Sequence, residues 1–127
     1  MRYRPEQHLR RQRDIRVVRE EGRRVDCQAF TVWWRTRPES QALPPLNPAR
    51  VCVIASAKAV GHAVLRNRAK RRLREVFRHQ QDRVPAGCDL LLIARLAATR
   101  WPLAELENRF AAACAQMQPA LGAPPPS

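Results

Sequence analysis

Acidic side chains are scarce in this sequence of 127 residues, where 11 Asp and Glu stand against 24 Lys and Arg, for a formal net charge of +13. A chain with so large an excess of one charge repels itself, so the imbalance predicts a polyanionic partner. No apolar run approaches the ~18 residues of a membrane span. The N-terminal stretch MRYRPEQHLRRQRD also has no apolar core for a signal peptide. We therefore expect a cytoplasmic protein with no membrane partner.

The sequence also lacks the spacings that usually carry protein-based chemistry. Its four cysteines form no CxxC pair and no ligand pattern with a histidine, so we expect reduced, buried thiols and no zinc site. No histidine has a matched serine or cysteine nucleophile, and the few carboxylates do not pair as two-metal chemistry requires. The sequence therefore indicates no catalytic residues and no metal site. The residues concerned are Cys27, Cys52, Cys88, Cys114, His8, His62 and His79.

The apolar pattern predicts a single folded domain over residues 1–118. Hydrophobic residues make up 45% of the chain, enough to build a core at this length. A short helix is expected with Gln12 as its N-cap and Gly22 at its C-terminus, where helices favour glycine. A second helix is expected over residues 102–118, and the proline-rich segment 119–127 is expected to be disordered. The apolar stripe of that second helix, typical of core packing, is formed by Leu103, Leu106, Phe110, Ala113 and Met117.

Three β-strands are expected. The first covers residues 25–35, which are rich in β-branched and aromatic side chains. Residues 36–49 contain four prolines and predict a loop. Residues 50–56 and 89–96 are apolar without alternation, as strands buried on both faces are.

A basic helix is expected between the last two strands, over residues 62–81. Its stretch RNRAKRRLRE places six cations in ten positions. At 100° per residue, an apolar sector of about 80° is formed by Leu65, Ala69, Leu73, Val76 and Gln80, with Phe77 beside it. The opposite side carries a ridge about 16 Å long, which we call the basic ridge and which consists of Asn67, Lys70, Arg71, Arg74 and Arg78. Glu75 is expected to lie apart from this ridge, near Arg68, Arg72 and His79.

The basic ridge favours nucleic-acid binding over a merely solvated face. Like charges at i,i+4 destabilise a helix by some tenths of a kcal/mol per pair, and only Glu75 is available to neutralise them. Arginine grips phosphate bidentately and stacks on bases. A membrane surface is a weaker alternative, because the modest apolar face is needed by the flanking strands. Asn67 could contact a base edge or 2′-hydroxyl, or simply cap the helix.

The stretch SAKAVGHAVLRNRAKRRLREVFRH resembles the signature of the bacterial ribonuclease P protein component, in which an Arg-Asn-Arg core is followed by Lys-Arg and Leu-Arg-Glu. LRRQRDIRVVREEGRR is similar to the opening helix of that family, FTVWW to its Phe-x-x-Tyr strand, and GCDLLLIARLAA to its late strand and turn. The likeness extends from Leu9 to Met117, in the expected order.

This resemblance implies a single-domain α/β (α+β) fold. It would have a mixed central sheet, a first short helix, the basic helix in a left-handed crossover, and a C-terminal helix. Crossovers are otherwise right-handed in nearly every case, so only the resemblance suggests this one. The resemblance also implies a subunit that binds a large catalytic RNA and helps it remove the 5′ leader from precursor tRNA. Mg²⁺ would be bound mainly by the RNA. The chain alone would be inactive, and no protein partner would be required.

The family's functional positions map onto two groups of residues. RNA binding is expected from Arg66, Asn67, Arg68, Lys70, Arg71, Arg74, Arg78 and Lys58. The leader cleft is expected at Ile15, Arg19 and Trp33, positions that are typically aromatic in the family. Because strand residues alternate, Trp33 and Trp34 face opposite sides of the sheet, and either one could line the cleft.

Two other functions compete with this prediction. A structural ribosomal protein would share the size and charge, but not the specific basic motif or an exposed aromatic cleft. A helical DNA-binding module is disfavoured because no helix-turn-helix spacing flanks the basic segment.

Overall fold

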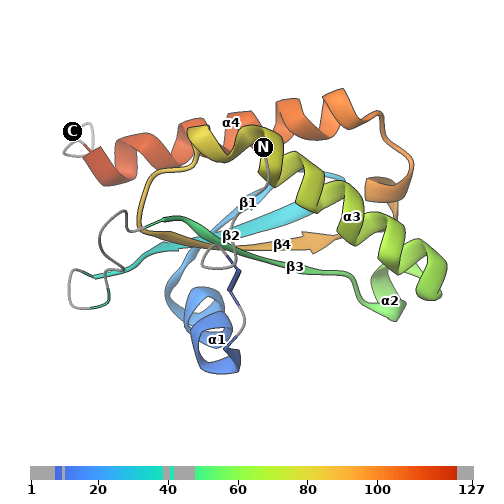
Figure 1. Cartoon of the computed structure of the whole chain (residues 1–127), viewed down its shortest axis with the longest axis horizontal. Coiled ribbons are helices and arrows are strands. Elements are labelled where there is room, and N and C mark those ends of the chain that lie inside the picture. Colours follow the sequence, from blue (N-terminus) through green and yellow to red (C-terminus); the bar gives the residue numbers. More distant parts are fainter. Residues whose placement is uncertain (1–7, 10, 39–40, 42–47, 123–127) are drawn as a thin grey trace.

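The computed structural model describes residues 8–9, 11–38, 41 and 48–122, the last five without their side chains. Its helices and strands form one α+β domain, as the sequence predicts (Figure 1). In chain order the elements are α1 (Gln12–Glu21), β1 (Arg23–Asp26), β2 (Phe30–Thr36), β3 (Arg50–Ile54), α2 (Ala57–Val60), α3 (Ala63–Gln80), η3 (Gln81–Arg83), β4 (Cys88–Ala94), η4 (Leu96–Thr99) and α4 (Leu103–Gly122).

The four strands form a mixed sheet in the order β1-β2-β4-β3. The β1–β2 and β2–β4 pairs are antiparallel, whereas β3 and β4 are parallel. A parallel pair needs a crossover connection, and here α2 and α3 provide it. The left-handed sense of this crossover stays the expectation drawn from the resemblance.

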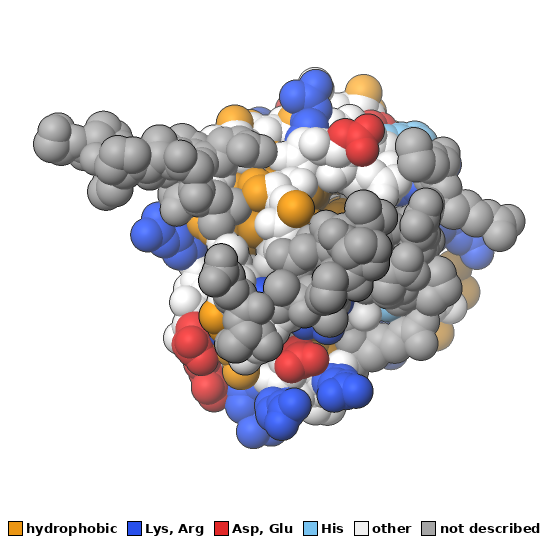
Figure 2. Space-filling view, turned by 60° about the vertical axis from the view of Figure 1, so that its left-hand side comes forward, with side chains coloured by type: hydrophobic (Ala, Val, Ile, Leu, Met, Phe, Trp, Pro, Cys, Tyr) orange, Lys and Arg blue, Asp and Glu red, His pale blue; other side chains and the backbone are white. Residues whose placement is uncertain are grey.

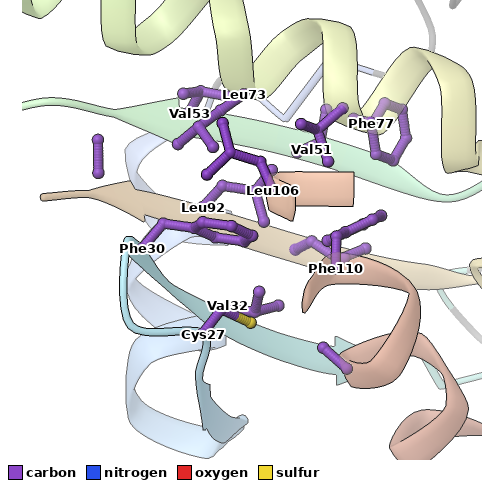
Figure 3. Packing of buried hydrophobic residues seen from close by; sticks show 14 of the residues in the cluster. Cys27, Phe30, Val32, Val51, Val53, Leu73, Phe77, Leu92, Leu106 and Phe110 are labelled. Atoms are coloured by element: carbon purple, nitrogen blue, oxygen red, sulfur yellow. The ribbon is translucent and has the colours of Figure 1, made fainter. Parts of the chain in front are cut away.

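Helices α3 and α4 cover one face of the sheet, and α1 lies on the other (Figure 1). The main core lies between the sheet and the two long helices, where Phe30, Leu73, Leu92 and Phe110 pack together (Figure 3). A smaller cluster on the α1 face contains the buried residues Leu9, Val18 and Leu91, with Ile15, Trp33, Cys52 and Ile93 partly buried against them. The sheet therefore separates a closed core from a partly open α1 face.

The predicted strand over residues 25–35 is instead a hairpin, β1 and β2. Its turn places Gln28 at φ 67°, a left-handed conformation that glycine usually occupies. Asp26 supports the turn, because its Oδ1 accepts a hydrogen bond of 2.7 Å from the Gln28 backbone N–H. The sequence prediction missed the turn because its residues, Asp-Cys-Gln-Ala, contain neither glycine nor proline.

Helix α1 ends where predicted, but for a different physical reason. Gly22 has φ −83° and ψ 174°, which is extended backbone and not the left-handed conformation of a glycine cap. A Cβ at Gly22 would lie 2.6 Å from the carbonyl oxygen of Trp34 and closer still to that of Val18. Glycine is needed here because the chain passes close to β2. The N-cap of α1 is Arg11, not Gln12, and it makes no side-chain capping bond.

Two further predictions need correction. Both faces of β4 are buried as expected, but burial alternates along β3, because Val51 and Val53 face the main core whereas Cys52 faces the partly open α1 side. Helix α4 continues to Gly122, which places residues 119–122 of the expected disordered tail inside a helix. Residues 123–127 of that tail, and most of the predicted loop, lie outside the described residues. No helix in the described part of the chain is long and apolar enough to cross a membrane.

Candidate nucleic-acid interface

Helix α3 turns its apolar side to the core and its cationic side outward. Ala69, Leu73, Val76 and Phe77 are fully buried, as the periodicity predicts. Gln80, expected in the same sector, is half-buried and donates a 2.9 Å hydrogen bond to Glu107 Oε1 of α4. Of the basic ridge, Asn67, Arg71 and Arg74 are exposed, whereas Lys70 and Arg78 are half-buried.

Two arginines of the basic segment are used to hold α3 in place. The Nε of Arg66 donates to the Ala55 carbonyl at 2.9 Å, which ties the start of α3 to the end of β3. Arg72 donates from Nε to the Ala98 carbonyl at 2.9 Å and from Nη2 to the Trp101 carbonyl. Arg72 therefore anchors α3 to the segment that precedes α4. It does not belong to the basic ridge.

Glu75 lies beside His79 as predicted, but it also pairs with a residue of the basic ridge, contrary to the prediction. Its carboxylate pairs with Arg78 and lies 2.8 Å from Nε2 of His79. The hydrogen bond from Arg78 is the main cause that lowers the pKa of Glu75. The charge of Arg78 is therefore partly neutralised, and the ridge is most strongly cationic around Lys70, Arg71 and Arg74. Helical spacing alone missed this because i,i+3 side chains can reach across adjacent faces.

A groove of about 460 Å³ runs beside α3, toward η4. It contains Val64, which is 66% exposed and which the sequence analysis did not select. The only signal in the sequence is an apolar residue on the polar side of a basic helix. The groove is lined by Val64, Asn67, Arg68, Arg71, Arg72 and Thr99, so it borders several of the expected RNA-binding residues.

The residues expected to form the leader cleft come together on the α1 face. Trp33 and Ile15 of α1 are both half-buried and pack against the same small cluster of Leu9, Val18 and Leu91. The guanidinium carbon of Arg19 lies 5.0 Å from the centroid of the Trp33 ring. Strand register aligns Trp33, Leu91 and Cys52 across β2, β4 and β3. This row forms the floor that α1 partly covers.

Trp34 faces the opposite side of the sheet and is 5% exposed, in the main core. Of the two adjacent tryptophans, only Trp33 therefore lies on the α1 face.

Two cations of the basic ridge act through their charge on a residue of the α1 face. Burial raises the pKa of Cys52, whereas the positive charges of Arg74 and Lys70 act in the opposite direction. Lys58 is exposed on α2, the short helix that precedes α3. The N-terminus of α2 is capped by Ser56, whose Oγ accepts a hydrogen bond of 3.1 Å from the Ala59 N–H.

The fold and the charge define a class: a small, strongly basic α+β protein with an exposed cationic helix. The family model described as Ribonuclease P matches residues 3–118. The chain therefore belongs to the bacterial ribonuclease P protein component family, the protein part of a ribonucleoprotein endoribonuclease that processes tRNA.

Individual relatives agree with this assignment. The ribonuclease P protein component of Rhodococcus opacus is 34% identical over 109 residues, covering 85% of this chain and 86% of that protein. The component from Syntrophobacter fumaroxidans is 36% identical over 100 residues, which cover 78% of this chain and 77% of that protein. The component from Symbiobacterium thermophilum is 48% identical over 63 residues, which are 50% of this chain and 54% of that protein.

Solved structures share the fold. The RNase P protein from Thermotoga maritima superposes with a TM-score of 0.70 at 24% identity, covering 86% of this chain and 96% of that one. The RNase P protein of Staphylococcus aureus gives a TM-score of 0.67 at 22% identity, covering 87% and 94%.

Proposed function

We propose that this chain binds the catalytic RNA of ribonuclease P through the basic ridge and holds the 5′ leader of precursor tRNA on the α1 face. It thereby assists the Mg²⁺-dependent removal of that leader. The observation that carries the proposal is the presence of two surfaces on one small domain, the exposed cations of α3 and the half-buried Trp33 on the α1 face. The first suits the phosphates of a structured RNA, and the second suits a base of a single strand.

The chemistry is assigned to the RNA subunit. Among the described residues, no three His, Cys, Asp or Glu side chains are grouped so that they could hold a metal ion. We assign affinity and positioning to the chain's own residues. Hydrolysis would use Mg²⁺ bound mainly by the RNA. Four free thiols agree with the reducing cytoplasm expected from the sequence.

The test is reconstitution. The purified chain is added to a bacterial ribonuclease P RNA and precursor tRNA at low Mg²⁺, and release of the leader is followed. We expect cleavage at the mature 5′ end to accelerate, with no cleavage by the chain alone. A structural ribosomal RNA binder would leave the rate unchanged. An RNA that is active at high Mg²⁺ yet unaffected by this chain at low Mg²⁺ would refute the proposal.

A further inference from the structure

Positive charge by itself does not identify the residues that bind RNA, because cations lie on several faces of this chain. Figure 2 shows Lys and Arg side chains gathered at the α1 end of the molecule. A hollow beside α1 is likewise lined by Arg11, Arg13, Arg35 and Arg50. The contacts that each cation already makes within the fold are therefore the better guide to its role.

The crossover segment, residues 55–62, connects the end of β3 to the start of α3. It contains α2, which lies beside the start of α3 (Figure 1) and whose four residues include one buried side chain, Val60. The segment turns at Gly61, where φ is 125°, a conformation that favours glycine. Because α2 buries so little of its surface, its position depends on the hydrogen bonds at the ends of the crossover segment.

Arg66 makes the hydrogen bond that closes the crossover segment. Its Nε donates to the Ala55 carbonyl at 2.9 Å, across 11 positions of the chain. The Arg66 side chain is half-buried, whereas the neighbouring Asn67 and Arg68 are exposed. At 100° per residue, Arg66 lies about 60° from the middle of the apolar sector of α3 and about 90° from the middle of the basic ridge. It therefore lies at the edge of the packed side of the helix.

Arg68, the second arginine of the Arg-Asn-Arg stretch, has no such contact. It is exposed and lines the groove beside α3. Within the described part of the chain it makes no hydrogen bond and no ion pair. Lys58 is also exposed, on α2. Arg68 and Lys58 are thus available to phosphate, whereas the Nε of Arg66 is already used by the fold.

We propose that Arg66 is a positioning residue for RNA binding, which holds α2 and its Lys58 beside the first turns of α3 and does not itself grip a phosphate. This inference rests on the proposed binding of the catalytic RNA by α3, and it gives Arg66 a role different from that of Arg68. Without the contact to Ala55, the crossover segment would have to be ordered again when RNA binds, and the cost of that ordering would reduce affinity. The effect of Arg66 therefore depends on the hydrogen bond at Nε more than on its charge.

Glutamine and lysine separate these two contributions. Glutamine carries no charge but has a nitrogen donor at the same number of bonds from the backbone as the Nε of arginine. Lysine keeps the charge and has a methylene at that position. Binding of full-length Arg66→Gln and Arg66→Lys to a bacterial ribonuclease P RNA is measured across a range of salt concentrations. Arg68→Gln and Arg68→Lys form the matched control pair.

The two arginines should rank the substitutions in opposite order. At Arg66 lysine should be the more damaging, weakening RNA binding by about fivefold, the effect of one hydrogen bond. The log–log salt slope of Arg66→Lys should stay like that of the wild type. At Arg68 glutamine should be the more damaging, with a slope shallower by about 0.7–0.9, the value for one phosphate contact.

A second measurement tests whether Arg66 acts through Lys58. In a Lys58→Gln chain, Arg66→Lys should cost no further affinity, because the cation that Arg66 positions is gone. Thermal melts establish that each variant is folded at the temperature of the binding assay. Should Arg66→Lys fail to fold, Arg66→Gln still decides, because it should change the salt slope less than Arg68→Gln does.

Two results would overturn the inference. Arg66→Gln could flatten the salt slope as much as Arg68→Gln, or the losses from Arg66→Lys and Lys58→Gln could simply add. Failure of the proposed function itself looks different. In that case the wild-type chain would neither bind the ribonuclease P RNA nor accelerate cleavage at low Mg²⁺.

Discussion

Arg19 lies across the indole ring of Trp33, with its guanidinium carbon 5.0 Å from the ring centroid. Arg19 is exposed, and cation–π contacts at exposed sites contribute about 0.5–1 kcal/mol. Stacking of a nucleic-acid base on an aromatic ring contributes about 1–3 kcal/mol. A base can therefore displace the guanidinium, which is then free to pair with a neighbouring phosphate. In this chain one aromatic ring and one movable cation occupy positions where the family tends to have aromatic residues.

Trp33→Ala tests the role of this ring. In the assembled enzyme we expect it to weaken precursor tRNA binding by about 1–3 kcal/mol, the value of one stacked base. Mature tRNA binding should stay nearly unchanged, and a one-nucleotide leader should erase the difference between wild type and variant. Equal losses for the two tRNAs would contradict the assignment. Trp34→Ala is the structural comparison, because it removes a core side chain and should instead lower the melting temperature.

The basic ridge should dominate the salt dependence of binding to the catalytic RNA. Replacing Lys70, Arg71 and Arg74 with glutamine removes three cations, so the log–log salt slope should become shallower by about 2.1–2.7. Stimulation of cleavage should be lost. Arg16→Gln together with Arg24→Gln provides exposed controls on α1 and β1. An unchanged slope in the triple variant would place the RNA elsewhere.

Arg71 and Arg72 are adjacent in sequence but should behave differently. Arg72 binds two main-chain carbonyls, so Arg72→Ala should lower the free energy of unfolding by about 1–3 kcal/mol. Arg71 is exposed, and Arg71→Ala should change stability by no more than about 0.5 kcal/mol while weakening RNA binding. Denaturant unfolding and RNA titration of both variants check this. A stable Arg72→Ala protein would show that its carbonyl contacts contribute little.

Leu73 tests the orientation of α3. Leu73→Ala should destabilise the fold by about 2–5 kcal/mol, because the side chain is fully buried. Leu73→Arg should destabilise the fold more than Leu73→Ala, even though it adds charge of the sign that RNA attracts. Val64→Ala, at an exposed position of the same helix, should be nearly neutral. A folded Leu73→Arg protein with improved RNA affinity would mean that the helix faces the other way.

The cysteines provide a test of the two faces of the sheet. Cys27, Cys88 and Cys114 are buried, whereas Cys52 is half-buried on the α1 face. A thiol reagent should therefore modify Cys52 first in the native protein, and all four thiols after denaturation. Cys52→Ser should abolish the fast phase. A fast phase that persists in this variant would show that another thiol is accessible.

The buried thiols also predict a loss of stability at alkaline pH. Burial raises the pKa of Cys27 and Cys88 to about 11 and that of Cys114 to about 12. The unfolded chain releases these protons near pH 8.5. The three buried thiols therefore contribute fully to the free energy of unfolding below that pH. Their contribution is lost as the pH rises toward the folded-state pKa values. The denaturant midpoint, measured across this pH range, should fall less steeply with pH for Cys114→Ala than for the wild type.

The sequence by itself determined the class of fold, the buried and cationic sides of α3, and the family. The fold class and the family came from the resemblance of its motifs to a known family. The two sides of α3 follow from local periodicity, because side chains four residues apart share a helix face whatever surrounds them. Alternation likewise showed that Trp33 and Trp34 point in opposite directions. It could not show which direction is the core, since that depends on where α1, α3 and α4 pack.

Only the tertiary structure decided the roles that depend on contacts between distant segments. It assigned Trp33 to the α1 face and anchored Arg72 to the carbonyls of Ala98 and Trp101. It also brought Arg13, Arg35 and Arg50 around one hollow. Sequence spacing carries no information on such groups, because strand register and the docking of α1 bring them together. The physical reason is that a side chain's charge and shape are local properties, whereas the partner it meets is set by the whole packed chain.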